Sequence, residues 1–204
     1  MRSTSSNSWV SSSHSVKDYD DPCSNVYTPS EDSFSVAGVA DGVIWDANMA
    51  CDLGCGAGVI AYALARRAGF VVATDISEAA VRCAKSRLAR REGANIDFVQ
   101  TEGLSAFRRE SFDVIVSNPP YLDSRDGDVR WDGGIMGIEV PLKFAGESFK
   151  ALEEKGLLII AVSSLSPVKL FEECLKAYGY LIVYRAIAHI GLMEALTIFV
   201  AKKL

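Results

Sequence analysis

The sequence predicts an α/β fold in which helices cover both faces of a mostly parallel sheet. Three observations support this prediction. Short apolar runs alternate with helical patterns, a glycine-rich loop joins the first run to a helix, and the last two strand patterns are separated by a short turn around Gly191. Alternating strands and helices form parallel sheets, whereas a short link between strands requires an antiparallel pair. We therefore expect seven strands, the last two forming a hairpin.

Length and composition limit the number of domains. With 204 residues, of which 49% are hydrophobic and 23% charged, the chain can bury one core but not two. Residues 1–21 are rich in serine and have few apolar positions, so they cannot offset the entropy lost on ordering. We expect a disordered tail over 1–21 and a single domain over 22–204.

Charge and cysteine content restrict the partners and the compartment. A net charge of −5 argues against a surface that holds nucleic acid, because such binding depends on cationic contacts to phosphate. No apolar run reaches membrane-spanning length, and no signal-peptide core follows the start. The odd number of cysteines predicts reduced thiols in a cytoplasmic protein. They are Cys23, Cys51, Cys55, Cys83 and Cys174.

The first helix is predicted from a capping box. Thr28-Pro29-Ser30-Glu31 places proline at the first helical position, with Thr28 and Glu31 able to bond each other's backbone N–H groups. We expect this helix to run to about Ala40.

A ligand-binding loop is predicted next. A strand over 49–53 leads into Asp52-Leu53-Gly54-Cys55-Gly56-Ala57-Gly58, which opens a helix over 58–68. Glycines allow close backbone approach, and a helix amino terminus favours anionic groups. The next strand, over 70–75, ends in Asp75, whose carboxylate can bind both hydroxyls of a ribose. This order predicts a nucleotide-type ligand.

The centre of the sheet is predicted from the following elements. After a helix over 78–92 and an outer strand over 97–101, the strand over 112–117 returns beside the first. That reversal creates a crevice at the carboxyl ends of the strands. Basic residues on the helix are spaced as a solvated face rather than an RNA patch.

Asn118-Pro119-Pro120-Tyr121 follows the central strand. Two prolines fix the backbone and can present the Asn side chain and the Tyr ring in one geometry. In isolation the motif also fits a rigid turn. The glycine loop upstream favours the binding function.

The rest of the chain completes the sheet. A loop over 122–138 precedes a helix over 139–154, a strand over 157–162, a helix over 167–178 and the hairpin strands over 181–187 and 194–201. The loop's carboxylates approach the spacing of a calcium site but lack its closing Glu, so we assign no metal.

These motifs together resemble class I S-adenosylmethionine-dependent amino methyltransferases. Val26–Phe34 is similar to the entry motif of HemK-type protein glutamine methyltransferases, in the short archaeal and eukaryotic branch that modifies class I release factors. Trp131–Gly134 and Gly137–Val140 are similar to that branch's loop after Asn-Pro-Pro-Tyr. The resemblance implies a three-layer Rossmann-like fold and methyl transfer to the amide nitrogen of a glutamine.

The resemblance also implies roles for particular residues. Asn118 and the Pro119 carbonyl would accept the amide protons, and Tyr121 would form an aromatic wall. Asp52 would lie near the donor's ammonium group, Asp75 on its ribose, and Ile76 and Glu102 at its adenine. Gly103 stands where the family usually has Leu. The full predicted set for the donor is Tyr27, Ser33, Asp52, Gly54, Gly56, Gly58, Asp75, Ile76, Glu102, Gly103 and Asn118.

Members of this branch commonly work with a small zinc-binding activator protein, which would add a strand beside 95–101. Three alternatives remain open from the sequence: an amino methyltransferase acting on adenine or guanine, a nicotinamide-dependent dehydrogenase, and a non-catalytic protein that retains the pocket. The net charge of −5 disfavours a nucleic-acid substrate, and the absence of a catalytic Tyr-x-x-x-Lys motif from the sequence disfavours a dehydrogenase.

Overall fold

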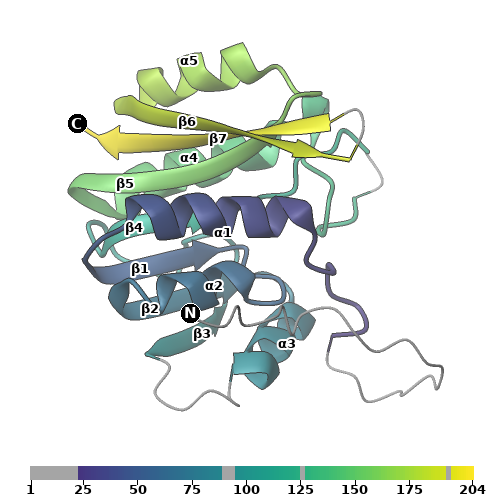
Figure 1. Cartoon of the computed structure of the whole chain (residues 1–204), viewed down its shortest axis with the longest axis vertical. Helices are drawn as coiled ribbons and strands as arrows, with labels where there is room; N and C mark the ends of the chain where they lie inside the picture. The colour runs from purple at the N-terminus through teal and green to yellow at the C-terminus, as the bar shows by residue number, and fades with distance from the viewer. Residues whose placement is uncertain (1–22, 89–94, 125–126, 192–193) are drawn as a thin grey trace, which may run out of the picture.

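The computed structural model describes residues 23–88, 95–124, 127–191 and 194–204. Within them, seven strands form one sheet in the order β3-β2-β1-β4-β5-β7-β6 (Figure 1). The pairs among β1 to β5 are parallel, while β7 runs antiparallel to both β5 and β6. The predicted fold, including the antiparallel hairpin at its end, is confirmed. The predicted disordered tail over 1–21 lies outside the described residues.

The strands and helices alternate as expected. The strands are β1 (Ala47–Leu53), β2 (Ala68–Asp75), β3 (Ile96–Gln100), β4 (Phe112–Ser117), β5 (Leu152–Ser163), β6 (Tyr180–Ile190) and β7 (Glu194–Lys203). The helices are α1 (Glu31–Val43), α2 (Val59–Leu64), α3 (Glu78–Leu88), the short 3-10 helix η1 (Ile135–Gly137), α4 (Glu139–Ala151) and α5 (Val168–Tyr178). No helix in the part of the chain that the structure describes is long and apolar enough to cross a membrane.

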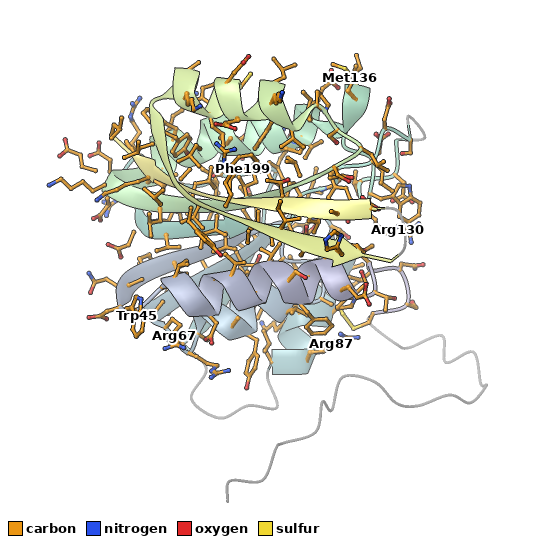
Figure 2. All side chains as sticks on the ribbon, turned by 45° about the horizontal axis from the view of Figure 1, so that its top comes forward. Trp45, Arg67, Arg87, Arg130, Met136 and Phe199 are labelled. Carbon is orange, nitrogen blue, oxygen red and sulfur yellow. A yellow bond between two sulfur atoms is a disulfide. The ribbon has the colours of Figure 1, made fainter. Side chains whose placement is uncertain are left out.

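Each face of the sheet has its own hydrophobic core. Val36 of α1, Ile60 of α2 and Ala84 of α3 pack on one face. On the other, α4 and α5 cover a cluster that includes Phe171 and Phe199. Figure 2 shows Phe199 inside the molecule, where it is fully buried. The three layers hold the sheet rigidly and leave its carboxyl edge to form the site.

That edge opens where the strand order reverses. β1 lies between β2 and β4, so the chain leaves it toward one side and leaves β4 toward the other. The Ser117 hydroxyl donates to the Leu53 carbonyl at 2.7 Å, which joins the two strand ends. A crevice therefore forms between the loops that follow β1 and β4.

The first helix begins differently from the prediction. Ser30, rather than Thr28, precedes its first residue, and no side chain caps the helix. The Ser30 hydroxyl instead donates to the Asp32 carboxylate at 2.6 Å, while Glu31 accepts from the Gly191 N–H. The capping-box prediction is wrong because the helix begins two residues later than expected and the Glu31 carboxylate binds the Gly191 N–H instead of reaching back to Thr28.

The prediction of reduced cysteines is also wrong in part. Cys23 and Cys83 form a disulfide across 60 residues, while Cys51, Cys55 and Cys174 are free. The segment before α1 crosses the buried face of α3, where Val26 and Ala80 pack beside Cys83. This proximity arises from the fold, so the sequence spacing gave no sign of it.

Candidate active site: a donor cavity and an acceptor recess

A cavity of about 280 Å³ lies over the carboxyl ends of β1, β2 and β4. Eight residues of the predicted donor site line it: Tyr27, Gly54, Gly56, Asp75, Ile76, Glu102, Gly103 and Asn118. Segments that are far apart in the sequence therefore meet in this cavity, at the point where the strand order reverses. Gly58, Ser33 and Asp52 do not line this cavity.

Asp75 fixes the floor of the cavity. Its carboxylate accepts the Gly56 N–H at 2.9 Å through one oxygen and the Ser77 N–H at 2.9 Å through the other. Burial raises the pKa of Asp75, and these backbone hydrogen bonds oppose that rise. The carboxylate thus ties the end of β2 to the glycine loop, and each oxygen keeps a lone pair for a ligand hydroxyl.

Asp52 lies beneath the glycine loop rather than in the cavity. Its side chain is fully buried, and one oxygen accepts the Ala61 N–H of α2 at 2.7 Å. The other oxygen has no hydrogen-bond partner in the part of the chain that the structure describes. Burial, with a smaller contribution from the charge of Asp75, raises the pKa of Asp52 to about 7 despite the bond from Ala61. In this position Asp52 holds α2 against the loop.

The packing around Gly103, at the far end of the cavity, explains why this position holds glycine where the family usually has Leu. A Cβ built there would lie 1.9 Å from Oε2 of Glu147, and the backbone φ of +56° favours glycine. The same Glu147 oxygen accepts the Leu104 N–H at 2.8 Å. Glu147 therefore occupies the space that a larger residue would need. Glu102, predicted at the adenine, pairs with Lys143 across the rim.

Asn118 belongs to both halves of the site. Besides lining the cavity, it lines a recess of about 60 Å³ together with Pro119, Tyr121, Tyr27 and Asp32. The predicted Asn-Pro-Pro-Tyr clamp thus faces a second, smaller space beside the first. This arrangement suits two ligands that meet at Asn118.

Asp32 is the main site residue for which no role could be predicted from the sequence. It lies at the start of α1, is 2% exposed, and accepts the Asn118 Nδ2–H at 2.9 Å. The hydroxyls of Tyr27 and Tyr121 donate to the same oxygen at 3.1 and 3.2 Å. Only its place in the entry motif Val26–Phe34 could have indicated it.

The other oxygen of Asp32 is equally engaged. It accepts the Ser30 hydroxyl and the Ser33 N–H, each at 2.6 Å, and the Ser33 hydroxyl at 3.3 Å. Ser33, predicted to contact the donor, therefore faces Asp32. Burial raises the pKa of Asp32, but the hydrogen bonds from Ser30, Asn118, Ser33 and Tyr27 outweigh it and leave the pKa below its ordinary value.

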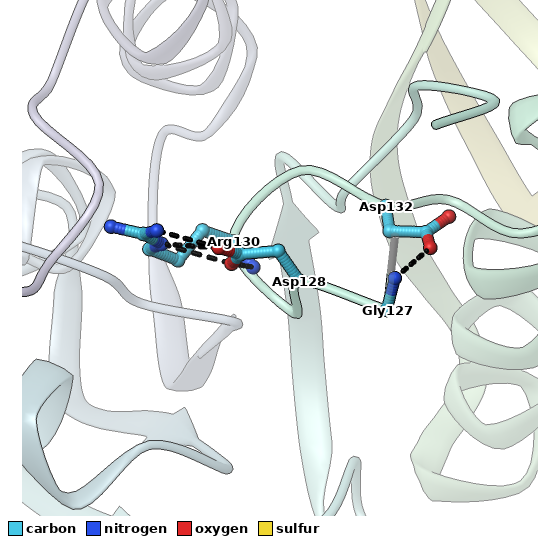
Figure 3. A network of polar contacts seen from close by, with 4 residues as sticks. All are labelled: Gly127, Asp128, Arg130 and Asp132. Carbon is cyan, nitrogen blue, oxygen red and sulfur yellow. Dashed lines mark hydrogen bonds and ion pairs between the residues drawn. The ribbon is translucent and has the colours of Figure 1, made fainter. Parts of the chain in front are cut away.

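The loop after β4 closes the recess. Figure 3 shows Asp128 paired with Arg130, and Asp132 accepting the Gly127 N–H at 2.8 Å. These carboxylates organise the loop. No group of three or more His, Cys, Asp or Glu side chains within the described ranges could hold a metal ion. A Cβ at Gly137 would lie 2.1 Å from the Tyr121 carbonyl, so the loop packs directly on the clamp.

Comparison with known proteins identifies the family. The model of the "Methyltransferase small domain" family matches residues 43–178, which contain the glycine loop and the Asn-Pro-Pro-Tyr motif. The chain belongs to this family. Membership implies S-adenosylmethionine as the methyl donor of this methyltransferase, as the sequence predicts.

Two relatives show how far the similarity extends. The methyltransferase is 42% identical over 88 residues to the release factor glutamine methyltransferase of Shewanella oneidensis, a match that covers 40% of this chain and 31% of that enzyme. It is 32% identical over 163 residues to a candidate protein N5-glutamine methyltransferase of Methanocaldococcus jannaschii, covering 76% of this chain and 81% of that protein.

Solved structures agree with the fold. The Mtq2–Trm112 complex of E. cuniculi matches with a TM-score of 0.70 and 28% identity, over 88% of this chain and 99% of that chain. A Pyrococcus horikoshii methyltransferase matches with a TM-score of 0.67 at 20% identity, over 92% of this chain and 91% of that chain. At 20% identity, the second match is evidence for a common fold and not for a common function.

Proposed function

We propose that this methyltransferase transfers a methyl group from S-adenosylmethionine to the side-chain amide nitrogen of a glutamine in a protein. The proposed substrate is the GGQ motif of a class I release factor, in the cytoplasm. One observation carries the proposal: Asn118 Oδ1 is buried where the cavity and the recess meet, and no described residue donates a hydrogen bond to it. A substrate N–H would satisfy this oxygen.

The residues of the cavity fit the donor. Its volume lies near the lower end of the roughly 300–1,000 Å³ of small-molecule sites. Asp75 offers carboxylate lone pairs for ribose hydroxyls, and Ile76, which is 49% exposed, offers an apolar surface for adenine. The donor supplies an electrophilic methyl group: its S–CH₃ bond would break as the N–CH₃ bond forms, releasing S-adenosylhomocysteine. The proton on the methylated nitrogen becomes acidic and would leave to water, so no strong base is required of the protein.

The chain's own residues would orient the acceptor. An amide nitrogen is a weak nucleophile because its lone pair is delocalised into the carbonyl. Hydrogen bonds from its protons to Asn118 Oδ1 and to the Pro119 carbonyl would raise the electron density on nitrogen and aim it at the methyl group. The Tyr121 ring would exclude water beside the reacting atoms.

The relatives support glutamine as the acceptor. Two carry glutamine methyltransferase names, and the E. cuniculi complex is described as responsible for methylation of the eRF1 termination factor. An exocyclic amine of adenine or guanine poses the same chemical problem and is the second candidate. The net charge of −5 disfavours a nucleic-acid substrate.

One experiment separates these acceptors. The protein is incubated with methyl-labelled donor and either a class I release factor or tRNA, and mass spectrometry locates the methyl group. We expect label on the glutamine of the GGQ motif and none after Asn118→Ala, with donor affinity largely retained. Label on tRNA alone would refute the proposed substrate, and loss of donor affinity with Asn118→Ala would contradict its role toward the acceptor.

We also propose that a small activator protein adds a strand beside β3. β3 lies at the edge of the sheet, and Ile96, Phe98 and Val99 are only partly buried there. Such an edge is prone to pair with another strand. The E. cuniculi relative was solved as a complex with Trm112.

Lysine substitutions on β3 test this partner. Phe98→Lys and Val99→Lys should release a co-expressed zinc-binding activator, whereas Gln100→Lys at an exposed position of the same strand should not. Size-exclusion chromatography of the co-purified proteins gives the readout, with melting temperature as the check on folding. Survival of the complex in both apolar-site variants would refute strand addition.

A further inference from the structure

The contact between Asp32 and Asn118 defines which end of the Asn118 amide faces the acceptor. The facing atoms are 2.9 Å apart. An ionised carboxylate can only accept hydrogen bonds, so the Asn118 atom that meets it must be nitrogen rather than oxygen. The amide oxygen is consequently turned away from Asp32.

The oxygen so turned is the one that lacks a partner. Among the described residues no group donates to Asn118 Oδ1, although the atom is buried. A buried acceptor without a donor is energetically unfavourable, so another interaction must hold the amide in this orientation. The hydrogen bond from Asn118 Nδ2–H to the Asp32 carboxylate is the interaction that keeps the amide in this orientation.

We infer that Asp32 is a positioning residue for methyl transfer, which holds the Asn118 amide with its oxygen directed at the acceptor nitrogen. The inference rests on the proposed function and extends it to a residue outside the Asn-Pro-Pro-Tyr motif. Asp32 also binds the Tyr121 hydroxyl, so one carboxylate sets both side chains of the clamp.

Asp32 does not serve as the general base. Both of its oxygens already accept hydrogen bonds, three on one oxygen and three on the other. A carboxylate held in this way is a weak proton acceptor. Its effect on the reaction therefore passes through Asn118 and Tyr121.

The arrangement restricts the acceptor. Asn118 Oδ1 can only accept, so the group in the recess must present an N–H or O–H. A primary amide satisfies this condition, while a tertiary amide does not. If Asp32 no longer fixes the orientation, Asn118 can rotate and present its NH₂ group instead, which repels an acceptor N–H.

The test compares Asp32→Asn with Asp41→Asn, which makes the same change on the same helix at a position bound to Arg67 outside the site. Loss of a charge-assisted hydrogen bond predicts a fall in kcat of about 10- to 100-fold for Asp32→Asn. The Kd for S-adenosylhomocysteine should stay within about twofold. Asp41→Asn should leave both values unchanged.

An NMR measurement distinguishes positioning from a merely structural role. The side-chain ¹⁵N–¹H₂ signal of Asn118, assigned by its loss in Asn118→Ala, should shift with Asp32→Asn and not with Asp41→Asn. An unshifted signal, or a kcat close to that of the wild type, would overturn the inference. If Asp32→Asn does not fold, Asp32→Glu keeps the charge but moves the carboxylate, and the same shift and loss are expected.

The NMR result does not depend on turnover. If the wild-type protein methylates no glutamine substrate, the proposed function fails. A shifted Asn118 signal would then still establish that Asp32 orients the amide, and an unshifted one would refute it.

Discussion

Asp75 illustrates how one side chain can serve both the fold and the ligand. Its two hydrogen bonds to backbone N–H groups hold the glycine loop, while its remaining lone pairs face the cavity. Removing the carboxylate therefore affects the donor site more than the acceptor recess, which is built around Asp32 and Asn118.

We expect Asp75→Ala to weaken donor affinity by about 1.5 to 3 kcal/mol, because hydrogen bonds to a charged group are lost. Isothermal titration with S-adenosylhomocysteine measures this change. Asp97→Ala, an exposed carboxylate on the neighbouring strand β3, is the matched control and should bind normally. Unchanged affinity in Asp75→Ala would remove this residue from the donor site.

Asp52 makes the stability of the protein depend on pH. Its pKa is raised from 3.8 to about 7, so the folded state binds a proton that the unfolded state has released. Stability from this group is therefore greatest at low pH and declines as pH rises from about 4 to about 7. A displacement of this size corresponds to about 4 kcal/mol as an upper limit.

The variant Asp52→Asn should lack this decline, because its amide is neutral at all these pH values and can still accept the Ala61 N–H. Urea unfolding between pH 5 and pH 8 gives the comparison, with the exposed Asp46→Asn as control. A wild-type free energy of unfolding that fell no more steeply over this range than that of Asp52→Asn would contradict the assignment.

At the scale of elements, the donor cavity is lined both by Ala80 of α3 and by the segment that precedes α1. The segment that leads into α1 carries Val26 and Tyr27, and the Cys23–Cys83 disulfide fastens it to α3. The first turn of α1 then places Asp32 beside Asn118, in the Asn-Pro-Pro-Tyr motif that follows β4. The site thus depends on a chain segment that is linked covalently to a neighbouring helix.

Breaking the disulfide should lower stability. In the chain-entropy description, a link across 60 residues restricts the unfolded chain, and loss of a disulfide costs about 2–4 kcal/mol. We expect Cys23→Ser to lose this amount in urea unfolding under oxidising conditions, while Cys174→Ser, at a free cysteine, does not.

A reductant provides the complementary measurement. Dithiothreitol should destabilise the wild type to the level of Cys23→Ser and leave that variant unaffected. A wild-type protein that is indifferent to the reductant would argue against the bond in solution.

At the scale of the whole molecule, the sequence predicted most of the architecture because the relevant signals are local. Apolar runs located each strand, and the short link at Gly191 identified the antiparallel hairpin. The same apolar runs predicted that Asp75 and Asn118 lie at the carboxyl ends of their strands. These features require no knowledge of which distant segments come together.

The features that the sequence did not reveal depend on such distant contacts. Asp32 contacts Asn118 only because α1 packs close to the end of β4 in the folded chain. The glycine at position 103 is required only because Glu147 of α4 occupies the space beside it. The sequence predicts a helix to 154 and the next strand only from 157, whereas α4 ends at Ala151 and β5 begins at Leu152. The difference arises because Glu153–Lys155 are polar and exposed although they continue the strand. Tertiary packing decides each of these cases.

The Asp32–Asn118 hydrogen bond has a consequence for how the protein acquires activity. It joins residues 86 positions apart, so the chain must close a long loop before the clamp exists. Contacts of this kind form late, after local helices and hairpins have reduced the entropy of closure. During refolding from urea, helical circular dichroism should therefore return before turnover does. Activity in this chain reports completed folding, and simultaneous recovery of both signals would show that the clamp forms early.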